Sequence, residues 1–276
     1  MFLKPLDFAS MYKEHKEATI FRGKNSADWD KKSKEMAPRM QNSSYVDEFI
    51  SRMNISSDDT VLDIGCGPGT LAIPLAKKVK EVIAIDFSAQ MLEELEAYAA
   101  REGITNIKTY LLGWDDDWSV LPKVDIVVAS RSMEVKEIDI ALQKMTTQAK
   151  KASYLTYKTG GSFVDMEILD FIGKTIITKP DFWYIPLLLY KDGYLPSIDY
   201  IPTKDGSIKY ANADEFVTSL IWSLGSLDDM QQQKAKEYFK LHIEESNNLP
   251  KPTMWAFVAW SSTKQEAISC KLGAYC

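Results

Sequence analysis

The stretch from Thr60 to Leu75, TVLDIGCGPGTLAIPL, constrains the fold more than any other part of this 276-residue chain. Its residues 61–64 form a short, mostly apolar run, which is the pattern of a buried parallel strand. Three glycines then occur within five positions, at Gly65, Gly67 and Gly69, and an apolar helical pattern follows at once. A strand, a glycine-rich turn and a helix in this order predict a nucleotide-cofactor site in a doubly wound α/β sheet.

The spacing of the glycines and two nearby carboxylates narrow the type of cofactor. A dinucleotide-binding turn has the pattern G-x-G-x-x-G, but Thr70 occupies the position of its last glycine here. Asp63 lies two residues before the first glycine, where it would repel a bound diphosphate and attract a cationic ligand. Asp86 ends the next apolar run, and a carboxylate there can accept hydrogen bonds from both ribose hydroxyls. These residues predict an adenosine-containing ligand that carries a positive charge.

The pattern D-x-G-x-G-x-G from Asp63 to Gly69 resembles motif I of the class I S-adenosylmethionine-dependent methyltransferases, whose cofactor carries a sulfonium and an ammonium. The resemblance covers residues 59–157 and implies S-adenosylmethionine as the cofactor and S-adenosylhomocysteine as the product. It also implies an α/β fold with a doubly wound, mostly parallel seven-stranded sheet, helices on both faces and an antiparallel last strand. We therefore expect the following residues to bind the cofactor: Trp29, Asp63, Gly65, Cys66, Gly67, Gly69, Asp86, Phe87, Met91, Trp114, Asp115, Ser130 and Arg131.

The adenine side of this expected site allows more than one assignment. The resemblance places Phe87 and Met91 beside the adenine, although a methionine on an apolar helix face is equally typical of a core residue. In the loop after the third strand, Trp114 would cover the ring and Asp115 would accept a hydrogen bond from the exocyclic amine. This acidic loop leaves open whether Asp115, Asp116 or neither makes that contact.

The end of the fourth strand and the N-terminal segment supply the other candidates. Backbone carbonyls of residues 130–132 are expected to face the methionine ammonium, and Arg131 to pair with either a substrate anion or a surface acid. Trp29 is either a lid over the cofactor or a core residue. The catalytic group is unknown; His15 and Tyr12, one helical turn apart, are candidates, although His15 also fits a solvated helix position.

The remaining periodicity divides the chain into three parts. Residues 1–55 are predicted to form a helical cap or lid, residues 56–262 the methyltransferase-like domain, and residues 263–276 a peripheral tail. Residues 163–195 are an aromatic-rich helical insertion after the fifth strand, and its Trp183 and Tyr184 are expected to wall the acceptor pocket. Strands are predicted at 61–64, 81–86, 107–112, 124–129, 152–157, 197–201 and 254–260, and helices at 45–53, 71–80, 88–101, 138–150, 213–224 and 227–245.

Composition and charge limit the partners. The net charge of −6 and the pI near 5.2 argue against a nucleic acid as the main partner. The first forty residues are an exception, with nine Lys/Arg and six Asp/Glu, so an RNA or protein methyltransferase that uses this basic arm is an alternative. No apolar run is long enough to span a bilayer, and no signal-peptide pattern begins the chain. Cys66, Cys270 and Cys276 form neither a metal-binding pattern nor a disulfide framework, which favours a cytoplasmic protein without a metal ion.

These observations together predict a methyltransferase that acts on a small-molecule acceptor as a monomer or homodimer. Residues 130–133 read Ser-Arg-Ser-Met and lack the Asn/Asp-Pro-Pro-aromatic tetrad of the family members that methylate adenine or glutamine amines. A nicotinamide-dependent oxidoreductase and a non-catalytic adenosyl-ligand binder are the alternatives from other functional classes.

Overall fold

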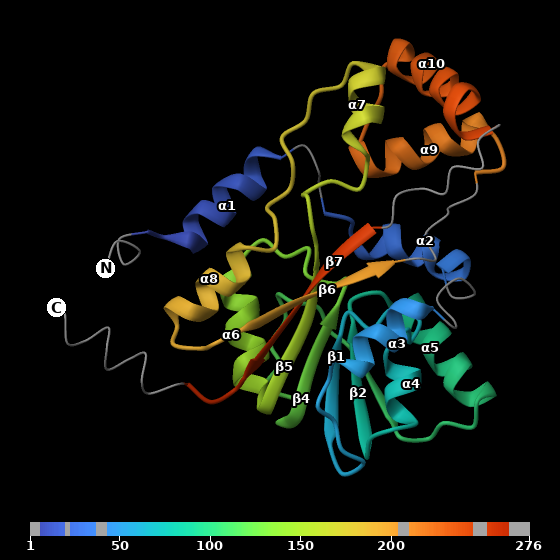
Figure 1. The fold of residues 1–276 in the computed structure, drawn as a ribbon. Helices are drawn as coiled ribbons and strands as arrows, with labels where there is room; N and C mark the ends of the chain where they lie inside the picture. The colour runs from blue at the N-terminus through green and yellow to red at the C-terminus, as the bar shows by residue number, and fades with distance from the viewer. Residues whose placement is uncertain (1–5, 20–22, 37–42, 204–209, 245–252, 265–276) are drawn as a thin grey trace.

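A mixed seven-stranded sheet organises the computed structural model, which describes residues 6–19, 23–36, 43–203, 210–244 and 253–264 (Figure 1). The strand order is β3-β2-β1-β4-β5-β7-β6. The strands are β1 (Thr60–Ile64), β2 (Glu81–Asp86), β3 (Ile107–Leu111), β4 (Val124–Ser130), β5 (Ala149–Lys158), β6 (Ser197–Thr203) and β7 (Thr253–Ser261). The first five strands pair in parallel, and β7 runs antiparallel to both β5 and β6. The predicted fold class is therefore confirmed, including the antiparallel last strand.

Helices cover both faces of the sheet because its inner strands are apolar on both sides. In β1, for example, Val61 packs toward one face and Leu62 toward the other, and both are fully buried. One face is covered by α1 (Phe8–Ala18), α6 (Ile138–Gln148) and α8 (Tyr184–Lys191), and the other by α3 (Ser44–Ser51), α4 (Ala72–Ala76) and α5 (Ala89–Arg101). The helix α4 ends at Ala76, earlier than the predicted end near residue 80.

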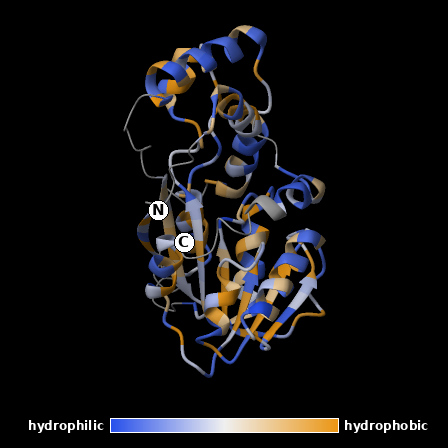
Figure 2. Ribbon diagram, turned by 90° about the vertical axis from the view of Figure 1, so that its right-hand side faces the viewer, coloured by the Kyte–Doolittle hydropathy of each residue, from blue (hydrophilic) through white to orange (hydrophobic). Residues whose placement is uncertain are grey.

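A third hydrophobic cluster forms a small helical unit, which we call the cap. It contains α7 (Met166–Ile172), α9 (Ala213–Leu224), α10 (Asp229–Tyr238) and the π-helix η2 (Phe239–Glu244). The helix α7 follows β5, and the other three lie between β6 and β7, so all of them attach at the edge where the parallel strands end. The cap lies at the top of Figure 1, and hydrophilic and hydrophobic residues alternate along its helices in Figure 2. The cap therefore covers the carboxyl edge of the sheet, where α/β proteins bind ligands.

The N-terminal helices lie at three different places. α1 packs on α6 and α8, α2 (Ser26–Met36) crosses α5, and α3 packs beside β6. Trp183 and Tyr184, at the start of α8, stack on each other with ring centroids 3.8 Å apart, and Tyr184 is packed edge-on against Tyr12 of α1. The insertion at 163–195 thus contributes α7 to the cap and α8 to a face of the sheet.

The C-terminal part of the predicted tail, residues 265–276 with Cys270 and Cys276, lies outside the described residues. Within the described ranges, the helices are too short or too polar to cross a membrane.

Candidate cofactor and acceptor site

The glycine-rich turn between β1 and α4 is shaped by close packing on two sides and is open on a third. Gly65 has a positive φ of 65°, and a Cβ built on it would lie 2.4 Å from Cβ of Ser132. A Cβ on Gly69 would lie 2.5 Å from a methyl carbon of Leu95. Gly67 has a φ of 53°, yet nothing lies within 4 Å of a Cβ built there. Gly65 and Gly69 are therefore required by packing, whereas Gly67 presents open backbone that a ligand can approach.

Asp63 places a buried carboxylate beneath this turn. The residue is 2% exposed, and the backbone N–H of Ala72 donates to its carboxylate at the start of α4. Its Oδ2 atom has no hydrogen-bond partner among the described residues. Burial, and then the nearby charge of Asp86, raise the pKa of Asp63 to about 7. A half-satisfied carboxylate in this position would be stabilised by a cationic ligand group.

Asp86 is fixed at the end of β2, beside the open glycine. Its Oδ2 accepts the backbone N–H of Gly67 at 2.8 Å, and its Oδ1 accepts that of Ser88 at 2.9 Å. Burial raises the pKa of Asp86, and the nearby charge of Asp30 on α2 adds to this effect. Each carboxylate oxygen keeps a further lone pair, so Asp86 can still accept hydrogen bonds from a diol.

Helix α2 is anchored to the same strand end. The hydroxyl of Ser88 donates to Oδ1 of Asp30 at 2.5 Å and accepts the N–H of Met91 as the N-cap of α5. Trp29, the neighbour of Asp30, packs edge-on against Trp222 of the cap with ring centroids 6.3 Å apart. Trp29 therefore connects α2 to the cap and does not lie in the group around the glycine turn.

The residues predicted around the adenine divide into exposed and buried ones. Phe87 is 41% exposed and lies next to Gly113, whereas Met91 is 3% exposed and packs inside the protein. Asp116 accepts the backbone N–H of Gly113 at 2.7 Å and is thereby used within the loop. Asp115 is exposed and forms no hydrogen bond or ion pair with the described residues. Phe87 and Asp115 are thus the two side chains of this group that remain available to a ligand.

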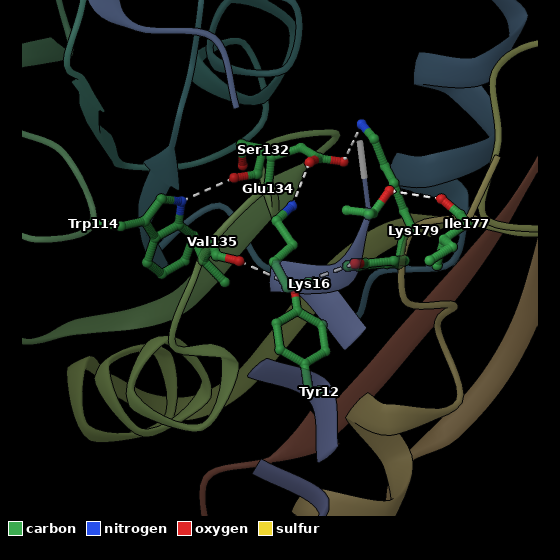
Figure 3. A network of polar contacts seen from close by, with 10 residues as sticks. Tyr12, Lys16, Trp114, Ser132, Glu134, Val135, Ile177 and Lys179 are labelled. Atoms are coloured by element: carbon green, nitrogen blue, oxygen red, sulfur yellow. Dashed lines mark hydrogen bonds and ion pairs between the residues drawn. The ribbon is translucent and has the colours of Figure 1, made fainter. Parts of the chain in front are cut away.

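Trp114 joins the adenine-side loop to the end of β4. Its indole N–H donates to the carbonyl of Ser132 at 2.9 Å (Figure 3). Lys144 donates to the carbonyl of Trp114 at 2.6 Å, which fixes the loop from α6. Because Ser132 also contacts Gly65, the loop, the glycine turn and the end of β4 form one continuous wall.

The segment after β4 holds Arg131 in an unusual backbone conformation. Its φ of 59° is the only positive φ of a non-glycine residue in the described ranges. Its N–H donates to Oγ1 of Thr156 at 3.2 Å, and its guanidinium lies 3.5 Å from the ring centroid of Tyr45. The hydroxyl of Tyr45 contacts those of Ser130 at 2.8 Å and Thr156 at 2.6 Å. This network holds the strained residue and stacks its guanidinium on an aromatic ring.

The other predicted residues belong to the core. Tyr12 is fully buried, donates to the carbonyl of Val135 at 3.0 Å (Figure 3), and has a pKa raised by burial. His15 lies 3.3 Å from the hydroxyl of Tyr184 and 3.0 Å from the carbonyl of Thr178. Cys66 is buried, and burial raises the pKa of its thiol. The structure thus places both catalytic candidates among packing contacts, away from the glycine turn.

A pocket on the other side of Arg131 was not foreseen from the sequence. Its volume is about 40 Å³, and it is lined by Arg131, Met133, Glu134, Thr156, Tyr157, Lys158, Gly161, Ser162, Phe163, Lys179, Pro180 and Trp255. Trp183 and Tyr184 are absent from this lining, so the aromatic wall comes from Phe163, Tyr157 and Trp255 instead. The signal in the sequence was weak: Lys158 is a single basic residue at the end of a strand, without a motif around it.

Comparisons with known proteins agree with this geometry. A family model described as a methyltransferase domain matches residues 55–170. An uncharacterised protein of Haemophilus influenzae is 32% identical over 266 residues, which cover 95% of this chain and 98% of that protein. A trans-aconitate 2-methyltransferase of Rhodococcus jostii is 28% identical over 119 residues, 42% of this chain and 44% of that protein. Several ribosomal RNA methyltransferases also match, over 25–32% of this chain.

A solved structure supports the fold independently. The S-adenosylmethionine-dependent methyltransferase of Aquifex aeolicus superposes with a TM-score of 0.52 at 14% identity, covering 84% of this chain and 97% of that one. Its identity is too low to show more than a shared fold. With the sheet order, the matched domain and the motif from Asp63 to Gly69, the comparisons lead to one assignment. The chain belongs to the class I S-adenosylmethionine-dependent methyltransferases.

Proposed function

We propose that this methyltransferase acts on a small-molecule acceptor, which binds between the glycine turn and the pocket beside Arg131. The observation that carries the proposal is the size of this pocket, because about 40 Å³ has room for only about three water molecules. The cap covers the same edge of the sheet, so a polymer would have to displace it. The trans-aconitate methyltransferase, which resembles part of this chain, is named for a small-molecule acceptor.

The residues around the turn fit S-adenosylmethionine. The unpartnered Oδ2 of buried Asp63 suits a cationic group of the cofactor, and Asp86 suits the ribose hydroxyls. Gly67 leaves the space that the cofactor needs, and Phe87 and Asp115 are exposed on the adenine side. When bound, S-adenosylmethionine supplies an electrophilic methyl group that an acceptor attacks in line.

The chain contributes mainly alignment and the exclusion of water. The cap and the wall at the end of β4 would hold the acceptor against the cofactor side, which reduces the entropic cost of the reaction. The described groups of the pocket are poorly suited to act as a general base. Burial raises the pKa of Tyr157, and although burial opposes it, the ammonium groups of Lys16 and Lys179 bring the pKa of Glu134 below its usual value. We therefore favour an acceptor that does not depend on a strong base of the protein.

The RNA alternative depends on the basic N-terminal arm, and the described part of that arm is occupied by the chain itself. Lys13 pairs with Glu137 at 2.7 Å and Lys16 with Glu134 at 2.6 Å. The ammonium groups of Lys24 and Lys32 lie 4.3 and 4.2 Å from the ring centroid of Trp222. Cations that already have partners contribute less to phosphate binding, which favours the small-molecule assignment.

A labelling experiment separates the two acceptor classes. Purified enzyme and methyl-tritiated S-adenosylmethionine are incubated with a metabolite fraction below 3 kDa and, separately, with total RNA of the source cells. The proposal predicts label in the metabolite fraction and none in RNA. Ribonuclease-sensitive label in the RNA arm, with an unlabelled metabolite fraction, would contradict it.

Location and assembly complete the proposal. A low number of cysteines without a disulfide framework supports a cytoplasmic location. We expect a monomer or homodimer, which light scattering of the purified chain would determine. The oxidoreductase and the non-catalytic binder are replaced by the methyltransferase assignment.

A further inference from the structure

We propose that the methyl acceptor carries a carboxylate, and that Arg131 and Lys158 bind this group inside the pocket. This inference rests on the proposed function, because it names the class of molecule that the acceptor site takes. No feature of the motif around the glycine turn requires it. It follows from the charges, aromatic rings and strand ends that the fold brings together beside that turn.

The charge of the pocket lining is the first argument. Three cations line it, Arg131, Lys158 and Lys179, and among the described lining residues Glu134 is the single carboxylate. Glu134 is shared by two ammonium groups, those of Lys16 at 2.6 Å and Lys179 at 2.9 Å (Figure 3). The lining therefore has an excess of positive charge that its own acid does not neutralise. An anionic ligand would balance this excess in a partly desolvated place.

Lys158 contributes most clearly to the excess. Its ammonium donates to the carbonyl of Thr159 at 3.1 Å and forms no ion pair with a described carboxylate. Burial lowers the pKa of Lys158, although charges of Asp165 and Asp181 oppose this effect from a distance. A buried ammonium without an ion-pair partner gains from a bound anion more than an exposed one does.

The topology puts both cations beside the reacting end of the cofactor site. Arg131 directly follows β4, and Lys158 ends β5, the next strand in the sheet. Ser130 pairs with Thr156 in the strand register, so the two strands end at nearly the same level. Ser132, next to Arg131, contacts the glycine turn and donates to the carbonyl of Ile64 at 2.6 Å. An anion held by the two cations would thus be adjacent to the cofactor turn.

Aromatic rings hold the cations and give the pocket an apolar side. The ammonium groups of Lys158 and Lys179 each lie 5.1 Å from the ring centroid of Phe163, and the guanidinium of Arg131 lies 5.2 Å from that of Trp255. Phe163 is 50% exposed, so part of its ring is available to a ligand. The positive φ of Arg131 shows that the backbone is held in a strained form to aim this residue. The pocket volume suits the carboxylate end of an acceptor whose remainder extends toward Phe163 and the cofactor.

Two isosteric probes test the inference without knowledge of the true acceptor. Benzoate and benzamide have the same shape and differ in charge, and their binding to enzyme saturated with S-adenosylhomocysteine is measured by calorimetry and tryptophan fluorescence. The proposal predicts that benzoate binds at least tenfold more tightly than benzamide. This preference should disappear in Lys158→Met and be largely retained in Lys158→Arg.

Control measurements separate this inference from the assignment of the cofactor. Lys108→Met removes an exposed lysine of β3 that pairs with Glu81, and it should leave the preference for benzoate unchanged. The affinity for S-adenosylhomocysteine is measured in every variant, and its loss in the wild type would refute the proposed function itself. If S-adenosylhomocysteine binds but benzoate shows no advantage over benzamide, binds not at all, or keeps its advantage in Lys158→Met, the inference is wrong. Tighter binding of phenyl phosphate than of benzoate would overturn the carboxylate assignment.

Discussion

Replacement of Asp63 by asparagine should stabilise the cofactor-free protein at alkaline pH while it weakens cofactor binding. Asp63 is buried, its Oδ2 has no described partner, and its pKa is raised to about 7 from an ordinary value of 3.8. Such a carboxylate is costly in the free protein. We attribute its presence to the cationic ligand that it receives.

The size of the effect follows from the pKa of Asp63. A folded pKa of about 7 against 3.8 means that the folded state holds the proton more tightly than the unfolded state. The free energy of unfolding therefore falls as the pH rises from 4 to 8, and at pH 8 the ionised group costs at most about 4 kcal/mol. The asparagine amide leaves one buried N–H donor without a partner, which costs about 1–3 kcal/mol. The net gain of Asp63→Asn at pH 8 should be about 1–3 kcal/mol.

Chemical denaturation at two pH values measures this prediction. Between pH 5 and pH 8, Asp63 alone should lower the wild-type free energy of unfolding by about 2.5 kcal/mol, and Asp63→Asn should remove this contribution. Cofactor affinity should fall about 10- to 100-fold in the variant, which corresponds to one lost charge-assisted hydrogen bond. The wild-type affinity should also fall below pH 7, because protonation of Asp63 competes with the cationic ligand.

The opposite result would refute the reasoning. If Asp63→Asn destabilises the free protein at pH 8 and leaves the cofactor affinity unchanged, Asp63 is a structural residue. Asp59→Asn is the control, since this buried aspartate has an ion-pair partner in Lys151 and should be stabilising in its ionised form. Its replacement should lower the free energy of unfolding at pH 8 and leave cofactor binding intact.

Three further substitutions test separate parts of the site. Asp86→Ala should abolish binding of S-adenosylhomocysteine in calorimetry with circular dichroism unchanged; retained affinity would exclude the ribose assignment. Gly65→Ala should destabilise the fold by about 1–3 kcal/mol in denaturation, because its Cβ would lie 2.4 Å from Ser132, whereas Gly67→Ala should mainly reduce cofactor affinity; equal effects of the two would contradict the packing argument. Tyr12→Phe should lower thermal stability by about 1–3 kcal/mol, since it leaves a buried carbonyl unpaired, and leave the turnover number within about twofold; a large loss of turnover would make Tyr12 catalytic.

The sequence predicted those parts of the protein whose local chemistry is distinctive. The strand before Gly65, the turn and the sheet class follow from apolar runs and from glycines that only certain backbone shapes require. The strand ends at Asp63 and Asp86 were identifiable because a carboxylate beside such a turn has few other uses. The β7 strand was also located by its apolar pattern, and its antiparallel pairing came from the family resemblance.

Other features depend on contacts between distant segments, which periodicity does not contain. The helical pattern of residues 213–245 shows an apolar face, but only the fold shows that this face packs on α7 to form the cap. Trp183 and Tyr184 are aromatic in either setting, and their packing against α1 decides their role. The cationic pocket escaped detection because Lys158, Lys179 and Glu134 come from three separate segments without a shared motif.

The central claim is that the turn flanked by Asp63 and Asp86 binds a positively charged adenosine cofactor. Its most direct test is a calorimetric titration of the wild-type protein with S-adenosylmethionine and, separately, with NADH at pH 8. We predict saturable one-site binding of S-adenosylmethionine and no binding of NADH. Saturable binding of NADH with none of S-adenosylmethionine would contradict the account.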